Sequence, residues 1–208
     1  MPAARKLITA AVTAAALVVA PAAANGKTAP HHKKGPKASI ALGDKRKATA
    51  RTSAITCSNT DVMPTADNVE LVRAAVLCLH NQIRQQHNLP LLKDNTKLRK
   101  AATGHSGDMV DEGYFDHTTP DGSSFVDRII GSGYVKRNDA WTLGENLAWG
   151  TGDLSTANGV MQAWMNSSGH KANILKRSYK ELGIGIRLGT PGDAGVGATF
   201  TADFGAKS

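Results

Sequence analysis

A short turn between two helical patterns organises the rest of this sequence, and it reads Trp164-Met165-Asn166-Ser167-Ser168-Gly169-His170-Lys171-Ala172-Asn173-Ile174-Leu175. Apolar residues before the turn recur at helical spacing, which predicts a helix over residues 156–167. We expect Gly169 to end this helix, because glycine adopts the left-handed conformation at little cost. Ser168 is then placed to cap a second, shorter helix that runs to Leu175.

His170 falls in the first turn of this second helix. The partial positive charge at a helix start disfavours the imidazolium ion and favours neutral imidazole, which binds metals and accepts protons. Two interpretations stay open at this point. His170 is either a functional side chain or a polar residue whose hydrogen bonds are satisfied at a helix start.

The chain of 208 residues is long enough for one domain with additional sequence before it. A basic start, an apolar alanine-rich run and three consecutive alanines at 22–24 predict a secretory signal peptide over residues 1–24. An uncleaved N-terminal anchor is the alternative, although the apolar run is short for a membrane span. We therefore expect a secreted protein, extracellular or associated with the cell envelope.

Residues 25–54 mix Lys, Gly, Pro, Ala and His without periodicity, which predicts a basic disordered linker. The whole chain carries a net charge of +8 and residues 1–54 carry +9, so the domain predicted over residues 55–208 carries −1. A nearly neutral domain argues against a nucleic-acid partner. The linker either contacts an anionic envelope or is a solvated spacer.

Cys57 and Cys78 are the only cysteines in the sequence. An even number of cysteines in an exported chain predicts one disulfide bond, which would join the start of the domain to its first helix. Two free thiols would require a reducing compartment, which conflicts with the predicted signal peptide.

Hydrophobic periodicity also predicts helices over residues 65–86, 95–111 and 123–130, and strands over residues 143–150, 181–188 and 196–204. In the strand over 181–188 the leucines and isoleucines point inward. The glycines point outward and leave room for something to lie close on that face. Because the helices come first and the antiparallel strands late, the expected fold class is α+β with helices covering the sheet.

Three residues outside the opening turn are candidates for function. His105 lies on a mostly apolar helix face, either as a core histidine with a hydrogen-bond partner or as a ligand. His117 lies on a loop, where binding groups concentrate. Glu145 shares a strand face with apolar residues, which is costly unless a histidine, an arginine, a metal or backbone N–H groups pair with it. The alternative for Glu145 is a tether to a loop backbone.

Four motifs occur in an order and spacing that resemble the CAP superfamily of cysteine-rich secretory, antigen-five and pathogenesis-related proteins. They are Phe115-Asp116-His117-Thr118-Thr119-Pro120, Gly144-Glu145-Asn146-Leu147, Trp164-Met165-Asn166-Ser167 with Gly169-His170, and Leu182-Gly183-Ile184-Gly185. The sequence is most similar to the bacterial branch with an SCP-like domain, over about residues 69–205. The resemblance implies a three-layer α-β-α sandwich with a central antiparallel sheet.

The resemblance also implies an open cleft in which His117, Glu145 and His170 meet and bind a divalent cation, with zinc as the expected metal. One position departs from the family pattern. Ser167 stands where the resemblance places a second acid, so the expected tetrad is reduced to a triad.

For function, the resemblance implies a secreted binding module for a lipid, a sterol, a peptide or an envelope ligand. The alternative is a metal-dependent, peptidase-like hydrolase in the same cleft, in which the cation activates a water molecule and Glu145 accepts its proton. A third interpretation is a structural or interaction domain in the envelope. The sequence assigns no residue a catalytic role.

Overall fold

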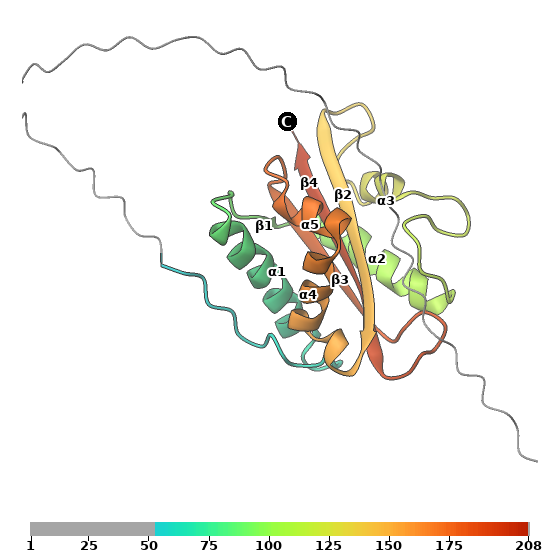
Figure 1. Ribbon diagram of the computed structural model, residues 1–208. Helices are drawn as coiled ribbons and strands as arrows, with labels where there is room; N and C mark the ends of the chain where they lie inside the picture. The colour runs from blue at the N-terminus through green and yellow to red at the C-terminus, as the bar shows by residue number, and fades with distance from the viewer. Residues whose placement is uncertain (1–52, 208) are drawn as a thin grey trace, which may run out of the picture. The chain divides into compact units, whose positions relative to one another are not determined.

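The computed structural model of the chain describes residues 53–207 (Figure 1). The predicted signal peptide over 1–24 and linker over 25–54 therefore lie, apart from residues 53 and 54, outside the described residues. The elements follow the order α1 (Val69–Gln86), β1 (Lys93–Asp94), α2 (Thr96–Asp111), α3 (Phe125–Gly131), β2 (Trp141–Thr151), the 3-10 helix η1 (Gly152–Ser155), α4 (Ala157–Asn166), α5 (Ser168–Leu175), β3 (Glu181–Leu188) and β4 (Gly197–Lys207).

The four strands form one sheet in the order β1-β3-β4-β2. Strand β4 pairs antiparallel with both β3 and β2, so the predicted antiparallel sheet is confirmed. Strand β1 adds a parallel pair with β3 that the sequence does not predict, because two residues are too few to show a periodicity. The long strand β2 is left at the edge of the sheet.

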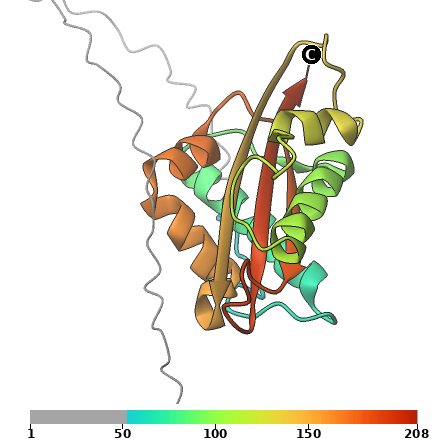
Figure 2. The same cartoon turned by 90° about the vertical axis from the view of Figure 1, so that its right-hand side faces the viewer.

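Helices cover both faces of the sheet, which confirms the predicted α-β-α sandwich (Figure 2). Helices α1, α4 and α5 lie on one face, over a core that includes the inward side chains Leu182, Ile184 and Ile186 of β3. Helices α2 and α3 cover the other face. One predicted core position is wrong, because Leu188 at the end of β3 is 39% exposed.

Helix α2 lies directly on the sheet because β3 presents glycines to it. A Cβ atom added at Gly183 would overlap the backbone of Leu98 and Arg99, and one added at Gly185 would overlap the backbone of Ala102 and Thr103. The room that the sequence predicted on this face is therefore filled by the backbone of α2. Any side chain at these two glycines would force the helix away from the sheet.

The turn between α4 and α5 differs in detail from the prediction. Ser167 has an extended backbone, with φ −99° and ψ 123°, and separates the two helices. Because any residue adopts this conformation, no left-handed glycine is needed, and Gly169 lies inside α5 without a positive φ. The predicted roles of Gly169 as helix end and Ser168 as cap are wrong, whereas His170 does lie in the first turn of α5.

Arg84 and a disulfide bond fix α1 to its surroundings. The side chain of Arg84 is fully buried and donates hydrogen bonds to the carbonyls of Pro90 (2.8 Å), Ile174 (2.8 Å) and Lys176 (3.0 Å). It thereby binds α1 to the C-terminal end of α5. The predicted disulfide between Cys57 and Cys78 is present, with an S–S distance of 1.99 Å.

His80 is a fully buried histidine in the core, and its ring centroid lies 5.5 Å from that of Trp164 and 5.6 Å from that of Phe204. Its Nδ1 donates to the carbonyl of Val76 at 2.8 Å, and its Nε2 has no hydrogen-bond partner within residues 53–207. Burial lowers the pKa of His80 to about 4. The imidazole is therefore neutral in the folded protein at any mildly acidic pH.

Gly185→Ala should destabilise the protein by at least about 3 kcal/mol, since the added methyl group meets the backbone of α2. A urea titration measures the free energy of unfolding. Gly107→Ala is the matched control, because Gly107 lies within α2 and a Cβ added there has no atom within 4 Å. That substitution should stabilise the protein by about 0.5 to 1 kcal/mol. A loss at both positions, or at neither, would contradict the packing described.

The free energy of unfolding should fall as the pH is lowered from about 6.5 to about 4, because unfolded His80 binds a proton over this range and folded His80 does not. The contribution of His80 is about 3 kcal/mol, from a shift of roughly 2.5 pKa units. Urea titrations of the parent and of His80→Gln at several pH values isolate it. Parallel stability curves for the two proteins would exclude a buried neutral imidazole.

Candidate functional site

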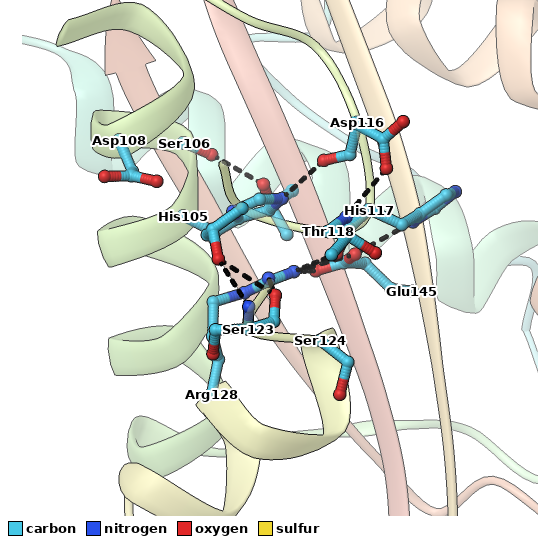
Figure 3. Close-up of polar contacts among 12 residues, drawn as sticks. His105, Ser106, Asp108, Asp116, His117, Thr118, Ser123, Ser124, Arg128 and Glu145 are labelled. Atoms are coloured by element: carbon cyan, nitrogen blue, oxygen red, sulfur yellow. Dashed lines mark hydrogen bonds and ion pairs between the residues drawn. The ribbon is translucent and has the colours of Figure 1, made fainter. Parts of the chain in front are cut away.

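The candidate site is built around the carboxylate of Glu145 on the edge strand β2 (Figure 3). The side chain of Glu145 is fully buried. Its Oε1 accepts a hydrogen bond from Nδ1 of His117 at 2.8 Å, and its Oε2 accepts one from the guanidinium of Arg128 at 2.9 Å. The same guanidinium nitrogen lies 3.1 Å from Oε1. The expected pairing of this buried carboxylate with a histidine and an arginine is therefore present.

His117 reaches Glu145 from the loop between α2 and α3, and two contacts hold that loop. The ring of His105 in α2 bonds through Nε2 to the carbonyl of Asp116 at 2.9 Å, and Arg128 donates to the carbonyl of His117 at 3.0 Å. His105 is only 1% exposed, so its prediction as a core histidine with a hydrogen-bond partner is confirmed. The imidazole of His117, by contrast, is 52% exposed and faces solvent beside a buried carboxylate.

Arg128 comes from the short helix α3 and was not singled out in the sequence. A capping box fixes the start of α3, in which Ser124 and Asp127 bond each other's backbone N–H groups. The helix predicted over residues 123–130 thus has Ser124 as its cap, and the carbonyl of Ser123 accepts a hydrogen bond from the Arg128 guanidinium at 3.1 Å. The Arg128 side chain is 12% exposed and spans from this helix start to Glu145.

A second buried carboxylate lies next to Glu145. Asp203 of β4 pairs with Glu145 in the sheet register and is 1% exposed. Neither of its carboxylate oxygens has a hydrogen-bond partner among residues 53–207. Burial and the neighbouring Glu145 raise the pKa of Asp203 well above its usual value. We expect Asp203 to be a neutral carboxylic acid at neutral pH.

The two neighbouring carboxyl groups, Glu145 and Asp203, have pKa values shifted in opposite directions. Burial alone would raise the pKa of Glu145, but the hydrogen bond from His117 and the charge of Arg128 outweigh it and lower the pKa. Glu145 is therefore ionised, while Asp203 beside it is neutral. One buried negative charge then faces one guanidinium, an arrangement that avoids an uncompensated charge in the interior.

His170 approaches the site from the opposite side of β2. The amide of Asn146 donates to the carbonyl of His170 at 3.0 Å, and Asn173 donates to the Glu145 carbonyl at 3.2 Å, so α5 is fastened along the strand. Burial lowers the pKa of His170, and His117 lowers it further. His170 is therefore neutral at neutral pH, as the sequence predicted for a histidine in this position.

The structure thus brings two of the three predicted metal ligands, His117 and Glu145, into direct contact. Within residues 53–207 there is no group of three or more His, Cys, Asp or Glu side chains placed to hold a metal ion. Glu145 is already engaged by Arg128, and Ser167 lies between α4 and α5 as an extended residue. The metal set of His117, Glu145 and His170 stays a prediction.

A pocket of about 450 Å³ opens beside Arg128 and extends along α2. Seven of its nine lining residues have polar side chains, and three of these are carboxylates. The lining residues are Gly104, His105, Asp108, Glu112, Thr119, Pro120, Asp121, Ser123 and Arg128. A ligand in this pocket would therefore meet several hydrogen-bonding groups.

The fold and the site together define an α-β-α sandwich with a histidine–glutamate–arginine group at the edge of its sheet. A family model described as CAP, the cysteine-rich secretory protein family, matches residues 77–204, which is more than half of the chain. This chain belongs to the CAP family. No helix within residues 53–207 is long and apolar enough to span a membrane.

Individual relatives agree with this assignment. The uncharacterized protein YkwD of Bacillus subtilis is 35% identical over 138 residues, which are 66% of this chain and 51% of that protein. An extracellular protein with an SCP domain from Bacillus anthracis is 30% identical with a TM-score of 0.52, and the match covers 68% of this chain and 43% of that one. An outer surface protein of Borrelia burgdorferi shares the fold, with 20% identity, a TM-score of 0.55 and coverage of 70% and 97%. The chain spans about half the length of YkwD and less than half the length of the protein from B. anthracis.

Arg128→Met should destabilise the protein by about 3 to 5 kcal/mol, because it leaves the Glu145 carboxylate buried without its guanidinium. Arg137→Met is the control, since Arg137 pairs with Asp127 in an exposed ion pair that contributes about 1 kcal/mol or less. Adding Glu145→Gln to Arg128→Met should recover part of the loss. Urea titrations of these variants and the parent test this, and equal losses for both arginines would contradict a buried pair.

Proposed function

We propose that this CAP protein is a secreted binding module whose ligand-facing group is the exposed imidazole of His117. The observation that carries the proposal is the hydrogen bond between Nδ1 of His117 and the buried carboxylate of Glu145. Arg128 holds this carboxylate in place through a second hydrogen bond. A carboxylate on one ring nitrogen fixes the tautomer and the orientation of a histidine and increases its basicity toward a ligand. The other ring nitrogen, Nε2, is then the free binding atom.

A divalent cation is part of this proposal, with zinc as the expected metal. The proposed donors are the imidazoles of His117 and His170, and the hydrogen bond to Glu145 already orients the first of them. Glu145 would orient His117 and would not bind the cation itself, since Arg128 occupies its oxygens. Solvent or ligand atoms would complete the coordination. When bound, the cation would supply an electrophilic contact for an anionic or carbonyl group of the ligand.

The same geometry favours binding over hydrolysis. A general base has to reach the water that it deprotonates, and its pKa has to lie near the working pH. Glu145 is fully buried, its pKa is lowered, and it is paired with Arg128. It is therefore suited to orienting His117 and unsuited to accepting a proton from a water in the cleft.

The polar walls of the pocket beside Arg128 support a peptide or an envelope glycan as the ligand more than a sterol or a fatty acid. Sites for apolar ligands are lined mainly by apolar side chains. Here three carboxylates, two hydroxyl side chains, His105 and Arg128 line about 450 Å³. The proposed location outside the cell agrees with the extracellular and outer-surface proteins that share the fold.

Zinc titration by calorimetry tests the binding group. The protein should carry His31→Gln and His32→Gln, because adjacent histidines in the N-terminal segment bind metals weakly. In this background, His117→Ala and His170→Ala should each weaken zinc binding at least about tenfold, since each removes one of the two imidazole ligands. His87→Ala is the control, because His87 is exposed at the end of α1 and away from the site.

Glu145→Gln separates orientation from ligation in the same titration. The amide preserves the shape of the carboxylate but bonds His117 less strongly, so zinc binding should weaken about tenfold and not disappear. Equal binding heats for the parent and both histidine variants would remove the metal from the proposal. Chelator-sensitive cleavage of casein by the parent would replace binding with hydrolysis.

A further inference from the structure

The end of the sheet at which β3 begins and β4 ends carries a ring of exposed lysines. Lys93 starts β1, Lys180 directly precedes β3, and Lys207 ends β4. The register confirms that these strand ends are neighbours, since Lys93 pairs with Glu181 and the backbone N–H of Lys180 bonds to the Gly205 carbonyl. This end lies at the top of the view in Figure 1, near the C-terminus.

Two further lysines extend the ring onto the helix layers on either side. The Nζ of Lys97 in the first turn of α2 donates to the Gly133 carbonyl at 2.8 Å, and Nζ of Lys176 after α5 lies 4.9 Å from the ring centroid of Tyr179. We call Lys93, Lys97, Lys176, Lys180 and Lys207 the lysine rim. All five are exposed, and they come from three parts of the chain, 93–97, 176–180 and the end of β4.

The lysine rim carries a net positive charge, since only two carboxylates, Asp94 and Glu181, adjoin its five lysines in the sequence. Within residues 53–207 none of the five lysines forms an ion pair with a carboxylate. The nearest acids in the sequence are engaged elsewhere. Asp94 pairs with Arg99 at 3.2 Å, and Glu181 accepts hydrogen bonds from Tyr134 and Asn95 at 2.7 Å. The folded domain is nearly neutral overall, so this concentration of charge is a local feature.

We propose that the lysine rim is a docking surface for a linear polyanion of the cell envelope with closely spaced phosphate groups. Lysine ammonium groups are compact point charges that bind phosphate without a fixed geometry. Neighbouring strands lie about 4.8 Å apart, so three strand ends and two flanking helices spread the lysines over roughly 20 Å. A flexible chain of phosphates contacts several of these lysines at once, whereas a single phosphate contacts one.

The distribution of apolar side chains favours a polymer over a bilayer. Surfaces that bind membranes combine basic residues with apolar side chains that enter the lipid. Here the exposed apolar residues Val62, Leu154 and Val196 lie at the opposite end of the sheet, and Leu91 is the exposed large apolar residue next to the rim. The amide of Gln85 donates to the Ser53 carbonyl at 3.0 Å, so Ser53 lies close to the end of α1.

The test measures binding of long-chain polyphosphate to the full chain by fluorescence anisotropy at several salt concentrations. Lys93→Gln/Lys180→Gln removes two rim charges whose side chains form no ion pair within residues 53–207, and Lys93→Arg/Lys180→Arg retains them. The Gln variant should weaken binding at least about tenfold and reduce the slope of log K against log salt by about 1.4 to 2. The Arg variant should bind like the parent.

Arg187→Glu is the control, because it changes the net charge by the same two units on an exposed side chain at the opposite end of β3. It should leave the affinity and the salt slope nearly unchanged. Equal binding by the parent and the Gln variant would show that residues 25–51 carry all the affinity and would overturn the proposal. Equally lysine-dependent sedimentation with vesicles of anionic lipid would overturn it in favour of a membrane. Neither outcome depends on zinc binding at His117.

Discussion

The backbone carbonyls on the edge strand β2 need hydrogen-bond partners, and the arrangement of the α4–α5 layer follows from how they are supplied. The side chains of Tyr179, Asn173 and Trp164 donate to the carbonyls of Leu143, Glu145 and Leu147, at 2.9, 3.2 and 2.9 Å. An uncovered edge strand is prone to pair with other chains. The three donors cover this edge and fasten α4 and α5 along it, which brings His170 to the strand that carries Glu145.

The opposite layer is fixed to the sheet by close contact. Gly183 and Gly185 allow the backbone of α2 to rest on β3, and Ser106 of α2 bonds Thr201 of β4 at 2.8 Å. His105, one residue earlier, is thereby buried and holds the Asp116 carbonyl, which places His117 against Glu145. The two histidines of the site thus approach one strand from its two faces, each held by its own helix layer.

The sequence predicts those features that repeat along the chain, and it fails where a single residue depends on distant partners. Alternation in β3 identifies both its core face and its glycine face, since each extends over several residues. Arg128 has no such signal, because an arginine in a seven-residue helix looks the same whether it faces water or a buried glutamate. Asp203 is one of the polar residues that alternate with apolar residues along β4, so the sequence does not distinguish it from its neighbours. Only the strand register shows that it lies next to a second buried carboxylate, Glu145. The helix end predicted at Gly169 is two residues late because glycine is the commoner helix end.

Glu145 has two ionisable neighbours in the interior, Arg128 and Asp203, and only the guanidinium of Arg128 can balance its charge. Arg128 keeps Glu145 ionised, while Asp203 stays neutral because two adjacent buried carboxylates rarely ionise together. The ionised carboxylate accepts the hydrogen bond from Nδ1 of His117 and so orients the imidazole, which leaves Nε2 on the side away from Glu145. The loop that carries His117 and the helix α5 that carries His170 thus both contact β2, through Glu145 and Asn146 respectively.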